Sequence, residues 1–329
     1  MIKIIQGNCI DKIKELEDNS IDCVVSSPPY FGLRDYGADG QFGLEKNYHD
    51  YLANTVKVFE TFKPKLKDTA TIWWNVGDSY SSGSRKTTTL QTVRKPKSNE
   101  ISESKQKYLD GLIVRPPIQT GIKEKDLMMI PNRVAIALQE AGWWIRSEII
   151  WHKPNPMPES VRDRPTSAHE KIWLITKNKK YYYDADAIKE PTTESTKQRY
   201  KSGWKGNEER DYVSGKQNHF SKYIGTEKSK QDALKGRNKR NVWTITTKPF
   251  KAAHFATFPP DLIEPCIKAG CPENGIVLDP FGGAGTTGIV AQSLNRQSIL
   301  IELNPEYIKI AKKRAENEFG LFNEILLTS

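Results

Sequence analysis

Residues 275–302 restrict the fold of this 329-residue chain more than any other segment does. They contain an apolar run ending at Asp279, a glycine-rich turn, a helical stretch ending near Leu294, and a second apolar run ending at Glu302. A strand, a crossover helix and a second strand in this order form a βαβ unit, whose two strands are parallel. The segment therefore predicts an α/β protein.

The turn itself, PFGGAGTTG at residues 280–288, indicates a ligand site. Glycines let a ligand come close to the backbone, and the start of the following helix offers free N–H groups. An acid at the end of the second strand, here Glu302, can bind both hydroxyls of a ribose. The loop lacks the lysine of a P-loop and differs from the dinucleotide fingerprint. A tight turn with a purely structural role is the alternative.

A second candidate site is DCVVSSPPY at residues 22–30, a short apolar strand that stops at two prolines and an aromatic ring. Proline has no N–H and a fixed φ, so Pro28 and Pro29 end the strand and keep the chain rigid. We expect the Ser27 hydroxyl and the Pro28 carbonyl to face a ligand as two fixed acceptors beside Tyr30. An ordinary strand-to-loop turn with a packed tyrosine is the alternative.

Two fixed acceptors suit the methylation of an aromatic exocyclic amine. Such an amine is a poor nucleophile because its lone pair is delocalised into the ring. Acceptors that hold its N–H groups favour a more tetrahedral nitrogen and stabilise the positive charge that develops on it. The ring of Tyr30 would stack on the base, as aromatic side chains do for an extruded nucleotide.

The net charge of +10 is concentrated in two hydrophilic segments. Residues 81–125 carry a net charge of +6 and residues 191–240 carry +7, which leaves the remainder slightly acidic. This distribution predicts a polyanion as partner, although solvated basic loops without a partner are the alternative. The second segment favours nucleic acid, because aromatic residues alternate with its cations: Tyr200, Trp204, Tyr212, Phe220 and Tyr223.

The remaining composition excludes several classes of protein. The four cysteines, Cys9, Cys23, Cys266 and Cys271, form no paired array, so we expect free thiols and neither zinc nor disulfides. The chain has no run of 18 apolar residues, which argues against a membrane span. Its first residues enter a strand pattern directly and do not resemble a signal peptide, which predicts a cytoplasmic protein.

Apolar periodicity predicts the other elements. Residues 31–37 read as a glycine-punctuated loop too polar for a core, either a mobile lid or a plain surface loop. Residues 181–183 begin a further extended piece, and segments 81–125 and 191–240 show no period. The predicted strands are 2–5, 21–25, 70–76, 143–151, 171–176, 241–247, 275–279 and 298–302, and the predicted helices are 10–16, 48–62, 127–141, 261–268, one ending near 294 and one beginning at 305.

Taken together, these blocks resemble the amino-group DNA methyltransferases that use S-adenosylmethionine. Residues 27–30 (SPPY) resemble the catalytic motif of that family, residues 279–286 (DPFGGAGT) its methionine-binding loop, and Glu302 its ribose acid. Residues 7–9 (GNC) match a turn that contacts the adenine, where the family usually has Gly-Asp, so Asn8 is a departure. The order resembles the β type, with the catalytic motif first and the cofactor loop last.

The resemblance implies a Rossmann-like class I methyltransferase fold with a mostly parallel sheet and helices on both faces. It divides the chain into a catalytic half at 1–190 (with 81–125 as a basic insertion), a target-recognition insertion at 191–240, and a cofactor-binding half at 241–329. It also implies S-adenosyl-L-methionine as cofactor and DNA as partner, with a restriction endonuclease partner or none, and a homodimer as one oligomeric state. The implied catalytic residues are Ser27, Pro28, Pro29 and Tyr30, and the implied cofactor-binding residues are Asn8, Cys9, Asp279, Phe281, Gly282, Gly283, Gly285, Thr286 and Glu302.

The implied reaction is direct transfer, with no covalent enzyme–base bond and no catalytic cysteine. A second aromatic residue would close the stack on the base, and we expect Tyr182 or Tyr183. Serine at position 27 favours cytosine N4 as the target, whereas adenine N6 enzymes usually carry Asp or Asn there. The alternatives are adenine N6, an RNA or protein-glutamine substrate, a catalytically inactive specificity subunit with the same fold, and, least favoured, a dinucleotide enzyme.

Overall fold

The chain forms two compact units in the computed structural model. The first comprises Met1–Tyr183 with Asn241–Ser329, and the second is Asp184–Arg240. The residues that the structure describes are 1–33, 40–81, 121–201, 231, 235–247, 258–320 and 325–328. Three predicted features fall outside this range: loop residues 34–37, most of segment 81–125, and the aromatic side chains of 191–240.

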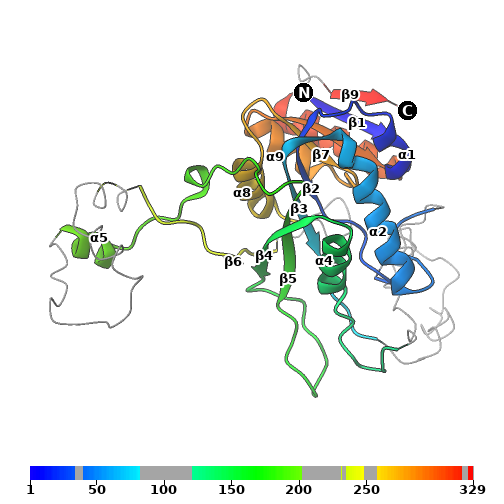
Figure 1. Cartoon of the computed structure of the whole chain (residues 1–329), viewed down its shortest axis with the longest axis horizontal. Helices are drawn as coiled ribbons and strands as arrows, with labels where there is room; N and C mark the ends of the chain where they lie inside the picture. Colours follow the sequence, from blue (N-terminus) through cyan, green and yellow to red (C-terminus); the bar gives the residue numbers. More distant parts are fainter. Residues whose placement is uncertain are drawn as a thin grey trace, which may run out of the picture. The chain divides into compact units, whose positions relative to one another are not determined.

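A nine-stranded sheet runs through the described part of the first unit, in the order β6-β4-β5-β3-β2-β7-β8-β1-β9 (Figure 1). Strand β5 is antiparallel to both of its neighbours, and the other pairs are parallel. The predicted mostly parallel sheet is therefore confirmed. The strands are β1 Ile2–Gln6, β2 Ile21–Ser26, β3 Leu66–Val76, β4 Trp144–His152, β5 His169–Thr176, β6 Val242–Thr244, β7 Ile276–Asp279, β8 Gln297–Glu302 and β9 Ile325–Thr328.

Strand β2 lies in the middle of this sheet, and all six of its residues are buried. Its sequence, IDCVVS, is nearly continuous in apolar residues because a central parallel strand is covered on both faces. Val24 lies opposite Ile72 of β3 on one side and Leu278 of β7 on the other. This register places the two candidate motifs side by side, although they are some 250 residues apart in sequence.

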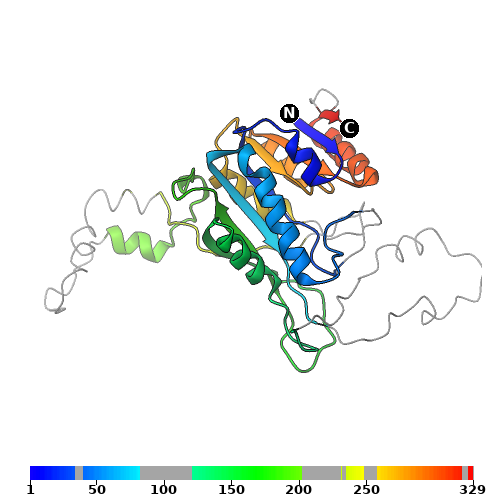
Figure 2. The same ribbon diagram turned by 45° about the vertical axis from the view of Figure 1, so that its right-hand side comes forward.

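Helices cover both faces of the sheet (Figures 1 and 2). One group packs together on one face, and the other group packs on the opposite face. The first group is α1 Cys9–Lys14, α2 Tyr48–Phe62 and α4 Ile130–Glu140, and the second is α8 Pro260–Gly270, α9 Thr286–Ser293 and α10 Pro305–Phe319. A 3-10 turn, η1 Lys63–Lys65, directly follows α2. This arrangement confirms the predicted fold class.

Helix α2 has the bounds that periodicity predicts for it. The Asn47 side chain caps its first turn by accepting a hydrogen bond from the Asp50 N–H at 2.9 Å. Its buried face is aromatic, and the Phe59 ring lies 4.9 Å from Trp74 of β3 and 5.3 Å from Trp143, both in edge-on geometry. These contacts pack the helix against the sheet near the end of β3.

The described residues of the second unit contain the 3-10 turn η2 Asp186–Ile188 and the helix α5 Glu194–Lys201. Glu190 joins the beginning of this unit to its end, through ion pairs with Arg237 at 3.1 Å and Arg240 at 3.4 Å. Periodicity missed α5 because its sequence is almost entirely polar, so it has no apolar stripe to detect.

The first unit departs from the predictions in three places. Phe31 is 1% exposed and its ring lies 5.6 Å from Tyr51, so the start of the 31–37 loop belongs to the core and the prediction of a loop too polar for a core is wrong. Residues 181–183 form no strand. Strand β9 was missed; it pairs with β1 at the edge of the sheet.

Phe59→Ala should lower the free energy of unfolding by about 3–5 kcal/mol, because it removes a fully buried ring from this aromatic cluster. Urea unfolding followed by far-UV circular dichroism measures the change. The matched control is Ile136→Ala on α4, where the side chain is 54% exposed and the expected change is within about 0.5 kcal/mol. Equal losses in both variants would contradict the packing described for α2.

Candidate active site

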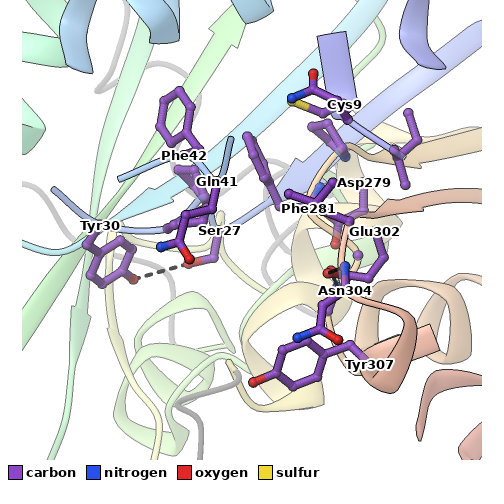
Figure 3. A pocket seen from close by; sticks show the side chains of 18 of the residues that line it. Cys9, Ser27, Tyr30, Gln41, Phe42, Asp279, Phe281, Glu302, Asn304 and Tyr307 are labelled. Carbon is purple, nitrogen blue, oxygen red and sulfur yellow. Dashed lines mark hydrogen bonds between the residues drawn. The ribbon is translucent and has the colours of Figure 1, made fainter. Parts of the chain in front are cut away.

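A pocket of about 360 Å³ opens at the edge of the sheet where the parallel strands end (Figure 3). In open α/β sheets, ligands bind outside the carboxyl ends of the strands, where the loops after neighbouring strands meet. The lining of the pocket comes mainly from the segments at the ends of four strands. These are residues 7–10 after β1, residues 27–30, 33 and 40–42 after β2, residues 279–284 and 286 at the end of β7, and residues 301–304 at the end of β8, together with Glu45, Asn54, Phe258 and Tyr307.

The buried carboxylate of Asp279 joins the two motifs. Its Oδ1 accepts hydrogen bonds from the Ser26 hydroxyl at 2.6 Å and the Phe281 N–H at 3.1 Å, and its Oδ2 accepts from the Thr287 hydroxyl at 2.6 Å. Burial raises the pKa of Asp279 from 3.8 to about 6, against the lowering effect of these three hydrogen bonds. Asp279 contributes to the lining, but these bonds engage both of its oxygens within the protein.

The glycine loop needs its glycines for close packing. A Cβ on Gly282 would lie 2.9 Å from the Leu300 Cβ, and a Cβ on Gly285, whose φ is +79°, would lie 2.9 Å from the Ala311 Cβ of α10. Both positions therefore let the loop sit against the helix and strand behind it. Gly282, Gly283, Phe281 and Thr286 line the pocket, whereas Gly285 does not.

Glu302 ends β8 with its carboxylate at the pocket. Its Oε2 accepts the Gly283 N–H at 2.8 Å and its Oε1 accepts the Asn304 N–H at 2.7 Å. Burial raises the pKa of Glu302, while these two backbone donors act to lower it. A carboxylate has about four acceptor positions, so both oxygens can accept further hydrogen bonds from a ligand.

Asn8 and Cys9 begin α1 on the wall of the pocket. The Asn8 side-chain oxygen accepts the Ile10 N–H at 2.9 Å, and an aspartate oxygen would form the same cap, so the departure from Gly-Asp keeps the helix start intact. Burial raises the pKa of the Cys9 thiol to about 12. A neutral buried thiol is a poor nucleophile, so Cys9 serves as an apolar wall residue.

The SPPY turn places its polar atoms in a connected set. The Ser27 hydroxyl donates to the Tyr30 hydroxyl at 3.2 Å, as the dashed line in Figure 3 marks, and the Tyr30 hydroxyl donates to Glu170 at 2.7 Å. The Tyr51 hydroxyl donates to the Pro29 carbonyl at 3.2 Å and holds the turn from behind. Ser27, Pro28, Pro29 and Tyr30 all line the pocket.

Figure 3 shows the two ends of the site. Ser27 and Tyr30 lie at one end, and Glu302, Asn304 and Tyr307 lie at the other, with Phe281 between them. The structure thus brings the two candidate motifs, predicted separately from the sequence, to one pocket. A ligand held at Glu302 can extend along the glycine loop toward Ser27.

Sequence reasoning missed several side chains of the lining, among them Gln41, Phe42, Asn304 and Tyr307. Asn304 caps α10 by accepting the Glu306 N–H at 2.9 Å, and the Asn-Pro pair before a helical pattern is a signal that would have found it. Phe42 lies in a loop without periodicity, and only the fold shows that its ring lies 5.3 Å from Phe281.

The prediction that Tyr182 or Tyr183 closes the stack on the base is wrong. The Tyr182 N–H donates to the carbonyl of Thr69, near the beginning of β3. The SPPY turn lies at the other end of this strand, because Ser26 lies opposite Trp74 near the end of β3. The Tyr183 ring stacks 6.5 Å from Trp73. Both tyrosines are therefore absent from the pocket lining, because the chain leaves β5 at the opposite edge of the sheet.

Within the described ranges, no group of three or more His, Cys, Asp or Glu side chains is arranged to hold a metal ion. Among the same residues, no helix has the length and apolar character needed to cross a membrane.

The chain matches the family model N6_N4_Mtase, described as DNA methylase, over residues 21–313. It belongs to this family, the S-adenosylmethionine-dependent DNA amino-methyltransferases that its motifs resemble, and it is a DNA methyltransferase of the N4/N6 class.

Two relatives align over nearly the whole chain. It is 41% identical to the type II methyltransferase M.Cfr9I of Citrobacter freundii over 96% of this chain and 88% of that protein. It is 43% identical to the type II methyltransferase M.SmaI of Serratia marcescens over 95% of this chain and 90% of that protein.

Two solved structures share the fold at lower identity. The PvuII DNA methyltransferase, which is cytosine-N4-specific, superimposes with a TM-score of 0.58 at 17% identity, over 99% of this chain and 94% of that one. A putative DNA modification methylase of Thermus thermophilus, solved in complex with S-adenosyl-L-methionine, superimposes with a TM-score of 0.56 at 20% identity, over the full length of both chains.

Asp279→Asn should change how stability depends on pH. The folded state raises the pKa of this carboxyl from 3.8 to about 6, so its contribution to stability is fully present below pH 3.8 and is lost as pH rises through 6. Because asparagine does not ionise, the variant should gain up to about 3 kcal/mol relative to wild type between pH 4 and pH 7. Urea unfolding at several pH values measures this difference, and parallel pH profiles would contradict the buried ionisation.

Proposed function

We propose that this protein transfers the methyl group of S-adenosyl-L-methionine to the exocyclic N4 amine of cytosine in DNA. The observation that carries the proposal is the single pocket that holds the acceptor Ser27 at one end and the ribose-type acid Glu302 at the other. Pockets of 300 Å³ or more with a few placed polar groups are typical small-molecule sites.

The pocket fits the cofactor on its own geometry. The Glu302 oxygens have lone pairs left for the two ribose hydroxyls after accepting from Gly283 and Asn304. Gly282 and Gly283 let the methionine part approach the backbone. S-Adenosylmethionine supplies a methyl group on a positively charged sulfur. The residues of the glycine loop and Glu302 would hold it in the pocket that Ser27 also lines.

The target amine is held by the SPPY turn. Its N–H groups donate to the Ser27 hydroxyl oxygen and the Pro28 carbonyl, while the base stacks on the ring of Tyr30. In this reaction the amine nitrogen would form the new N–C bond as the S–C bond of the sulfonium breaks, with S-adenosylhomocysteine as leaving group, and one amine proton would then pass to solvent. The protein contributes orientation and stabilisation of positive charge, and needs neither a covalent intermediate nor a cysteine nucleophile.

Two observations support cytosine as the target base. Serine stands first in the SPPY tetrapeptide, and the PvuII enzyme, which shares the fold, is cytosine-N4-specific. The same two acceptors also suit adenine N6, which is the first alternative. A DNA-binding specificity subunit without catalysis is the second alternative, and the complete set of Ser27, Tyr30, Asp279 and Glu302 around one pocket argues against it.

DNA must approach the sheet edge at which the pocket opens. The basic segments 81–125 and 191–240 provide the charge for this contact, and the second is the target-recognition segment in this proposal. The proposal leaves two alternatives for partners, either a restriction endonuclease, suggested by the type II names of the relatives, or none, and it includes a homodimer as one oligomeric state.

Incubating the purified protein with S-adenosylmethionine and unmethylated genomic DNA should produce N4-methylcytosine, detected by mass spectrometry after digestion to nucleosides. A peak of N6-methyladenine instead would keep the chemistry and refute the inference from Ser27 to cytosine. Absence of both products, with cofactor binding intact by calorimetry, would refute the catalytic proposal.

Glu302→Ala should weaken the binding of S-adenosylhomocysteine by about 1–3 kcal/mol, the cost of leaving the ribose hydroxyls without their acceptor. Isothermal titration calorimetry measures the affinity. The control is Glu306→Gln in the first turn of α10, where the carboxylate is exposed and pairs with Lys309 at 2.7 Å. If Glu302→Ala binds as tightly as this control, Glu302 does not hold the ribose.

A further inference from the structure

A line of polar contacts runs from Lys153 to the catalytic serine. Lys153 at the end of the β4 strand pairs with Glu170, Glu170 accepts from Tyr30, and Tyr30 accepts from Ser27. We propose that Glu170 is a positioning residue that fixes the Tyr30 hydroxyl, so that Ser27 presents its lone pairs to the target amine. The inference rests on the proposed function of the SPPY turn and assigns a role to a residue that was not among the predicted site residues.

The position of the Tyr30 hydroxyl proton decides which groups donate and which accept along this line of contacts. The phenol has one proton and two candidate acceptors, Glu170 Oε2 at 2.7 Å and Asn75 Oδ1 at 3.1 Å. Hydrogen bonds to a carboxylate are shorter and stronger than those to a neutral amide, so the proton points to Glu170. The phenol oxygen then offers its lone pairs to the Ser27 hydroxyl, whose oxygen lies 3.2 Å away.

Neighbouring polar side chains hold the Glu170 carboxylate in place. Its side chain is 17% exposed and pairs through Oε1 with Lys153, which is 19% exposed. The Asn75 amide donates to Glu170 Oε2 at 3.2 Å and to the Lys171 carbonyl at 3.2 Å, so its nitrogen faces β5. Asn75 and Lys171 belong to adjacent antiparallel strands, and their register holds this group of side chains together.

Gly77 fixes the ring of Tyr30 from the other side. A Cβ at this position would lie 2.5 Å from Tyr30 Cε2 and 2.8 Å from Cδ2, closer than real Cβ contacts. The tyrosine ring therefore lies directly against the backbone that follows β3. The contact with Gly77 fixes the position of the Tyr30 ring, and the hydrogen bond to Glu170 fixes the direction of its hydroxyl. The Tyr30 oxygen that accepts from Ser27 therefore has little freedom to move.

The consequence for the reaction concerns the Ser27 oxygen. A serine hydroxyl can donate or accept, and the N–H of the target amine, which donates, needs it in the accepting form. Because the Ser27 proton is directed to Tyr30, both lone pairs of its oxygen are left for the N–H of the amine. Hydrogen bonds aligned in one direction polarise one another, so the negative charge of Glu170 also strengthens Ser27 as an acceptor.

A double-mutant cycle in methyl transfer tests this positioning role. Tyr30→Phe and Glu170→Gln should each lower the single-turnover rate on cognate DNA by about tenfold, as expected for the loss of a charge-assisted hydrogen bond. The double variant should be no slower than the slower single variant, because both changes interrupt the same line. The KM for DNA and the affinity for S-adenosylhomocysteine should stay within twofold of wild type.

The matched control is Glu148→Gln, which removes a carboxylate that pairs with Lys171 at 2.6 Å on the neighbouring strands without touching Tyr30. Its single-turnover rate should equal that of wild type. Multiplying effects in the double variant, or a full rate in Tyr30→Phe, would overturn the proposal. If Glu170→Gln does not fold, the rate of Tyr30→Phe alone still decides, and a wild-type protein that methylates no DNA would refute the proposed function instead.

Discussion

The buried carboxylate of Asp279 is the contact on which the site depends. It accepts hydrogen bonds from Ser26, from the N–H of Phe281 and from Thr287, and so joins the residue before the catalytic turn to the loop that receives the cofactor. Burial disfavours its charged form, and the three donors offset much of that cost. Without this contact, β2 and β7 would still be neighbours, but the two loops after them would lack a common anchor.

Strand adjacency explains why the order of the motifs along the chain is unimportant for the chemistry. Strand β2 carries the SPPY turn and β7 carries the glycine loop, and the two strands pair in parallel at the centre of the sheet. Both loops therefore leave the sheet at the same edge, with Glu302 of β8 next along. The catalytic half can precede the cofactor half in sequence because the sheet restores their proximity in space.

The sequence predicted those parts of the structure that rest on strong local signals. The β7–α9–β8 unit and the helix at 48–62 follow from apolar period and glycine spacing. Ser27, Phe281 and Glu302 were assigned to one enzyme only through the resemblance to the methyltransferase family. The rest depends on tertiary contacts that leave no local mark. Phe31 is core because Tyr51 covers it, Phe42 reaches the pocket only through the fold, and Tyr182 misses the site because β5 is antiparallel. Glu170 meets Tyr30 across 140 residues, which no spacing rule can anticipate.

The most direct test of the central claim is a crystal structure of the protein with S-adenosylhomocysteine. A single pocket for cofactor and target base predicts the ribose hydroxyls on Glu302, the amino-acid part along Gly282 and Gly283, and the sulfur facing Ser27. Ligand bound away from Glu302, or bound with its sulfur turned from the SPPY turn, would contradict the assignment of one pocket to both functions.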